Sequence, residues 1–106
     1  MFIETSANHV KAHLASLLLA FELGTDGGEA VALDIVEFIA LRMKSREDYQ
    51  IGVLGFFVRA NLIALDQNVI SFSEALSRVT AAALAAPLGH AELTETFEAG
   101  LGDLFS

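Results

Sequence analysis

The feature that most constrains this chain is the stretch from Tyr49 to Leu65, where few side chains can hydrogen bond to water. Only Gln50, Arg59 and Asn61 interrupt a run of otherwise apolar or glycine positions. Over the whole chain 54% of the residues are hydrophobic, against roughly 45–50% in an ordinary soluble domain. A chain of 106 residues buries only part of its surface. We therefore expect some apolar surface to be covered by a partner.

No apolar run is long enough to predict a membrane span. A transmembrane helix needs about 20 predominantly apolar residues. Here Glu22 closes the first apolar run, Asp34 and Glu37 divide the second, and Arg59 lies inside the third. Residues 1–4 lack the basic start and the long apolar core of a signal peptide. The sequence thus predicts a cytoplasmic protein without membrane contact.

Charge and cysteine content exclude several classes of function. Fourteen acidic residues against six basic ones give a net charge of −8. This charge repels the phosphates of nucleic acids and of anionic membranes, so we expect no direct nucleic-acid binding. The chain contains no cysteine, which excludes disulfides, thiol catalysis and cysteine-ligated metals.

The positions of glycine and proline predict a succession of helices, and no segment shows sustained strand alternation. We therefore expect one all-α domain over residues 1–106, folded as a compact bundle of four to five helices. The third helix is expected to be the buried centre of the bundle. The helices are predicted from Thr5 or Ser6 to Leu23, from Glu29 to Lys44, from Arg46 to between Asp66 and Asn68, from Ser71 to Pro87, and from Glu92 to Phe105.

Two serines predict helix starts through the capping box, in which a serine and an acid three residues later cap each other's backbone. Ser71 and Glu74 form the usual pattern, and Ser45 with Asp48 forms a variant. Gly52 and Gly55 fall within the first turns of the predicted third helix. The two residues are explained either by close approach of another helix or by simple tolerance.

The last predicted helix has the clearest amphipathic pattern in the chain. At 100° per residue, one face collects the apolar side chains and the glutamates lie off it. Gly100 and Gly102 weaken the helix. The pattern leaves open whether its own bundle or another protein covers this face, which consists of Leu93, Phe97, Leu101, Leu104 and Phe105.

Neither metal chemistry nor catalysis is supported by a motif. His9 and His13 have the i, i+4 spacing of two zinc ligands, but the glutamate that zinc peptidases place after the first histidine is missing. A calcium loop ending at Glu74 would place Leu65 and Gln67 at ligand positions, which excludes it. We therefore expect no enzyme, no metal and no cofactor.

These observations predict a non-catalytic regulatory or adaptor protein, acting as an antagonist, an anti-activator or a chaperone-like module. Apolar helical faces would bind another protein, and surrounding acids would favour a basic partner. In the free state we expect a symmetric homodimer, with intermolecular surface on the second and fifth helices. The residues predicted to bind the partner are Leu93, Phe97, Leu101, Leu104 and Phe105 in the last helix and Phe56 and Phe57 in the third.

One alternative function is small-molecule binding, with an apolar pocket between helices around Phe38, Phe56 and Phe57. Arg59 also has two interpretations within its apolar helix. It pairs with a carboxylate, either Asp66 or an acid of another helix or subunit, or it extends to the edge of a helix interface.

Overall fold

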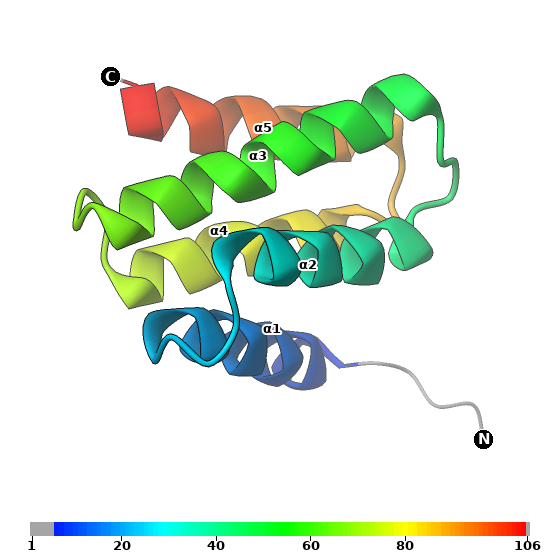
Figure 1. The fold of residues 1–106 in the computed structure, drawn as a ribbon. Helices are drawn as coiled ribbons and strands as arrows, with labels where there is room; N and C mark the ends of the chain where they lie inside the picture. The colour runs from blue at the N-terminus through cyan, green and yellow to red at the C-terminus, as the bar shows by residue number, and fades with distance from the viewer. Residues whose placement is uncertain (1–5, 106) are drawn as a thin grey trace.

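The computed structural model describes residues 6–105, and within this range it contains five helices and no strand (Figure 1). The predicted all-α bundle is confirmed. The helices are α1 Ala7–Glu22, α2 Gly28–Arg42, α3 Asp48–Asp66, α4 Phe72–Ala85 and α5 His90–Phe105.

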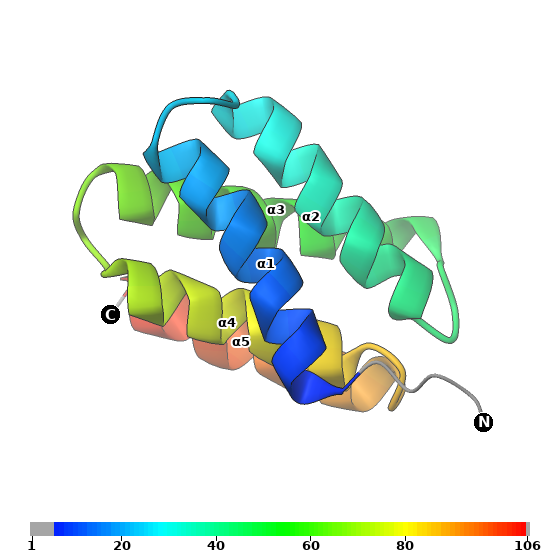
Figure 2. The same ribbon diagram turned by 90° about the horizontal axis from the view of Figure 1, so that it is seen from below.

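The helices stack in three layers, with α3 and α5 in one layer, α2 and α4 in the next, and α1 on the opposite side (Figure 1). Figure 2 shows α1 lying across α2 and α4, which are the helices it packs against. The prediction that the third helix is the centre is wrong. Instead, α4 packs against all four other helices, whereas α3 packs against α2, α4 and α5. Fully buried alanines such as Ala75, Ala82 and Ala83 keep α4 thin enough for this position.

Two predicted N-caps are confirmed. The Ser6 hydroxyl accepts a hydrogen bond from the His9 N–H at 3.2 Å, and Thr5 lies outside the described residues. At α4, the Ser71 hydroxyl accepts from the Glu74 N–H at 3.1 Å, and the Glu74 carboxylate accepts from the Ser71 N–H at 3.0 Å. At the other end of α1, Gly24 has φ +75°, a conformation that favours glycine and stops the helix.

The predicted start of the third helix is wrong. α2 ends at Arg42, and Met43 is extended with ψ 141°. The chain stays outside a helix through Ser45, and the N-cap of α3 is Glu47, which makes no side-chain capping bond. The Ser45–Asp48 pattern therefore does not mark the start of α3. Residues 43–47 form the connection between α2 and α3 instead.

The first half of the apolar face of α5 is covered by the chain's own bundle. Leu93 and Phe97 are 1% and 2% exposed, and the ring of Phe97 packs on Phe57 of α3 with centroids 5.1 Å apart. A Cβ placed on Gly100 would lie 2.5 Å from Cε1 of Phe57. Gly100 therefore admits the Phe57 ring to the backbone of α5.

Candidate protein-binding surface

The structure distributes the seven predicted binding residues between the core and the surface. Phe57, Leu93 and Phe97 are buried within the chain itself. Leu101 and Leu104 are half-buried against the core, and the side chain of Phe105 lies outside the described part of the structure. Phe56 is 55% exposed.

Phe56 belongs to a continuous stripe along the solvent-facing side of α3. Ile63, two turns further on, is 57% exposed, and Tyr49, two turns earlier, is 71% exposed. Exposed Gly52 and half-exposed Ala60 lie between them. Because the spacings are three, four and seven residues, all five share one side of the helix. We call Tyr49, Gly52, Phe56, Ala60 and Ile63 the outer face of α3.

A groove of about 290 Å³ runs beside the outer face, between α3 and the end of α5. Phe56, Ala60 and Ile63 form its α3 wall, and Leu104 of α5 closes the other side. Val69, 61% exposed in the turn after α3, extends the apolar lining at one end. The outer face therefore has both protruding side chains and an apolar recess, which a docking surface requires.

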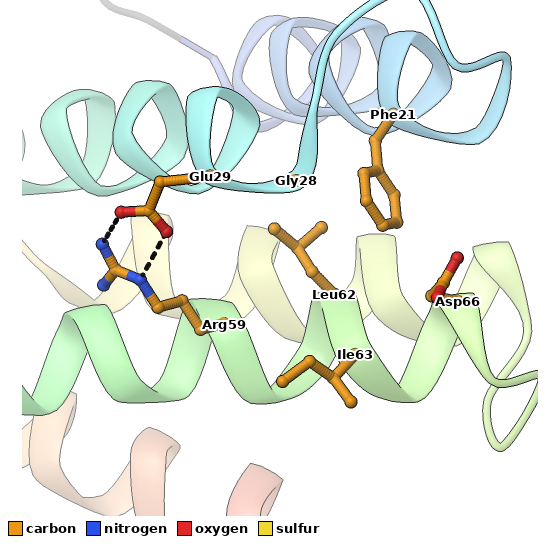
Figure 3. Close-up of a pocket in the computed structure, with 7 residues that line it drawn as sticks. All are labelled: Phe21, Gly28, Glu29, Arg59, Leu62, Ile63 and Asp66. Atoms are coloured by element: carbon orange, nitrogen blue, oxygen red, sulfur yellow. Dashed lines mark hydrogen bonds and ion pairs between the residues drawn. The ribbon is translucent and has the colours of Figure 1, made fainter.

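A second hollow, of about 330 Å³, lies on the other flank of α3, beneath the α1–α2 connection (Figure 3). Figure 3 shows Phe21 of α1 and Leu62 of α3 between two polar ends, with Arg59 at one end and Asp66 at the other. The Phe21 ring lies against Gly28, where a Cβ would be 3.2 Å from its Cε1 atom. This hollow is more polar than the groove beside α5, so it is a weaker apolar docking site.

Arg59 pairs with Glu29 of α2 through two hydrogen bonds, Nε to Oε1 at 3.0 Å and Nη2 to Oε2 at 2.7 Å (Figure 3). The acid of another helix is thus the partner, and Asp66 is not. These hydrogen bonds lower the pKa of Glu29 and raise the pKa of Arg59. The Arg59 side chain is 40% exposed, so the pair adds little stability. Its effect is to neutralise the one charge on α3 between Asp48 and Asp66.

The histidine pair of α1 has no ligand cluster around it. His9 is exposed, and the ring of His13 lies 4.4 Å from the ring of Phe38. Among residues 6–105, no three histidine, aspartate or glutamate side chains come together as ligands for a metal ion.

The three aromatic residues expected to enclose a small molecule have different surroundings. Phe57 packs on Phe97, Phe38 faces His13, and Phe56 projects from the outer face of α3. The structure therefore gives the three rings different neighbours and does not bring them together around one space.

Comparison with known families, proteins and structures identifies no relative of this chain. No protein-family model matches the chain, and no curated protein or solved structure is significantly similar to it. In the described range, none of the helices has both the length and the hydropathy to cross a bilayer.

Sequence analysis missed Tyr49, Ile63 and Val69 as members of this surface. The signal available was the spacing of Tyr49, Phe56 and Ile63, each seven residues from the next. α3 is apolar nearly all the way round, so this spacing alone does not distinguish the outer side from the core side.

Proposed function

We propose that this chain is a non-catalytic regulatory or adaptor protein that binds another protein through the outer face of α3 and its groove. In this role it acts as an antagonist or a chaperone-like module, occupying an apolar site on its partner. The free chain is a symmetric homodimer in this proposal.

The observation that carries the proposal is the exposure of Phe56 and Ile63, two turns apart on the same side of α3, next to an apolar groove. Exposed aromatic side chains beside a recess are typical anchors of protein interfaces. Leu93 and Phe97 are buried by the chain's own fold. The proposal therefore moves the binding surface from α5 to α3, with Leu104 as the contribution of α5.

Affinity capture from the native host with paired variants tests the proposal. Phe56→Asp places a charge at the centre of the outer face, and Leu41→Asp places one at a 65% exposed leucine of α2 that lines neither hollow. The proposal predicts a stoichiometric partner that wild type and Leu41→Asp retain and Phe56→Asp loses. Retention of the same partners by all three proteins would refute it.

A second candidate function is the binding of an apolar small molecule in the groove between α3 and α5. The supporting observation is its volume of about 290 Å³, near the lower limit of roughly 300 Å³ for ligand pockets. Native mass spectrometry of the purified protein tests this function. A bound mass that Ala60→Phe removes would support it, and an unmodified chain mass would exclude a retained ligand.

A further inference from the structure

We infer that the outer face of α3 is occupied in the free protein by the outer face of a second copy, with the two α3 helices antiparallel about a two-fold axis near Arg59 and Ala60. This inference rests on the proposed use of the outer face for protein binding and identifies its occupant. Three observations on α3 carry it: the distribution of charge, the spacing of the large side chains and the place of Gly52.

The distribution of charge favours a second copy over a basic partner. Two chains that each carry a net charge of −8 repel one another over most of their surface. Between Asp48 and Asp66, however, α3 carries no carboxylate. The only charge there, Arg59, is already neutralised by Glu29. A basic partner would find no unpaired acid along the outer face of α3. A second copy would meet a face without net charge, so the two copies do not repel one another there.

An antiparallel two-fold arrangement allows the large side chains of the outer face to pack on one another. Phe56 and Ile63 lie at equal distances from the midpoint between Arg59 and Ala60. A two-fold axis through this midpoint therefore places Phe56 of each copy against Ile63 of the other, as a symmetric interface requires. Ala60 is small, so the two helices can approach closely at the centre.

Gly52 supplies the third observation, because the single chain gives no reason for it. A Cβ at this position would meet nothing within 4 Å. A glycine inside a helix also makes that helix less stable than an alanine would. In the antiparallel arrangement, Gly52 faces Gln67 of the second copy. The missing side chain then leaves space for Gln67, which is exposed in the single chain.

Disulfide trapping tests this arrangement, because the chain contains no cysteine of its own. Ala60→Cys places one thiol of each copy beside the two-fold axis. The two Cα atoms are then within the separation of about 4–7 Å that a disulfide needs. Tyr49→Cys is the matched control on the same stripe. In the antiparallel arrangement its two copies are about 30 Å apart, at 1.5 Å of rise per residue.

Under mild oxidation we expect Ala60→Cys to become a covalent dimer and Tyr49→Cys to remain a single chain. Adding Phe56→Asp to Ala60→Cys is expected to reduce the yield of covalent dimer at least about tenfold. The inference is overturned if Ala60→Cys does not crosslink, if Tyr49→Cys crosslinks as well, or if Phe56→Asp leaves the yield unchanged.

The outcome is separable from that of the proposed function. If Ala60→Cys does not crosslink but Phe56→Asp loses a heterologous partner, another protein occupies the outer face and only the present inference fails. If the disulfide forms and capture is unaffected by Phe56→Asp, the outer face serves the dimer alone. Circular dichroism of each variant confirms that the helices remain folded.

Discussion

The ring of Phe57 lies against the bare backbone of Gly100, which joins α3 to α5 without an intervening side chain. A Cβ on Gly100 would lie 2.5 Å from Cε1 of Phe57, closer than packed atoms allow. The same ring packs on Phe97, three residues before Gly100 in α5, with ring centroids 5.1 Å apart. The ring is therefore held from two sides and cannot easily move away.

Gly100→Ala is accordingly expected to destabilise the fold by roughly 1–3 kcal/mol, the usual cost of overpacking a core. Gly102→Ala is the matched control, since a Cβ there meets nothing within 4 Å. The control should gain up to about 1 kcal/mol from its better helix propensity. Urea unfolding followed by circular dichroism measures both. Equal stabilities of the two variants would show that the Phe57 ring yields to the added methyl group.

Features that depend on neighbours in the sequence could be predicted. The caps Ser6 and Ser71 and the shared apolar face of Leu93 and Phe97 follow from local spacing. The assignment of these two residues to a partner did not hold, because the chain's own bundle buries them. The ion pair of Arg59 could not be assigned, because its partner lies 30 residues away on another helix. Long-range packing, which the local pattern does not contain, decides such contacts.

The binding surface was only partly predictable, for a physical reason. Phe56 and Phe57 are adjacent and chemically identical, yet one is exposed and the other is fully buried. A step of 100° around the helix separates them. Because apolar residues surround most of α3, its hydrophobic pattern has no strong direction, and only the packing of α2, α4 and α5 fixes which phenylalanine points outward.

The capping box of α4 predicts a clear loss on mutation. Ser71→Ala removes the hydroxyl that accepts the Glu74 N–H at 3.1 Å, and we expect a loss of about 1 kcal/mol in the free energy of unfolding. Ser73→Ala, two residues into the same helix and exposed, is the control and should change stability little. A loss of similar size in both variants would contradict a specific role for Ser71.

Stability is expected to fall in acid partly through Glu74. Its hydrogen bond from the Ser71 backbone N–H, then that from the Ser71 side chain, lower its pKa below the ordinary value of 4.5. A lowered pKa contributes stability that is complete above the ordinary pKa and is lost as the pH falls through the lowered one. Glu74→Gln should therefore flatten the decline in urea midpoint below about pH 4.5.

Glu95→Gln on α5 is the control for this acid dependence, because the Glu95 side chain makes no hydrogen bond or ion pair within residues 6–105. It should reproduce the wild-type decline. An identical decline in Glu74→Gln would show that the capping box does not contribute to the acid dependence.

A substitution at Gly52 is expected to change the stability of the helix and the association of two chains in opposite directions. Gly52→Leu should raise the thermal stability of the single chain, because leucine is a better helix former and meets open space. In the proposed dimer the added side chain collides with the second copy, so association should weaken. Sedimentation and thermal unfolding of the same samples measure the two effects. A variant that associates at least as well as wild type would contradict close approach at Gly52.

The most direct test of the account is the molar mass of the free protein by light scattering after size exclusion, over a dilution series. Wild type and Leu41→Asp are predicted to pass from twice the chain mass to the chain mass on dilution. Phe56→Asp is predicted to have the chain mass throughout, with unchanged helix content. A wild-type protein that has the chain mass at every concentration, or a Phe56→Asp variant that dimerises like wild type, would contradict the outer face of α3 as the surface between two copies.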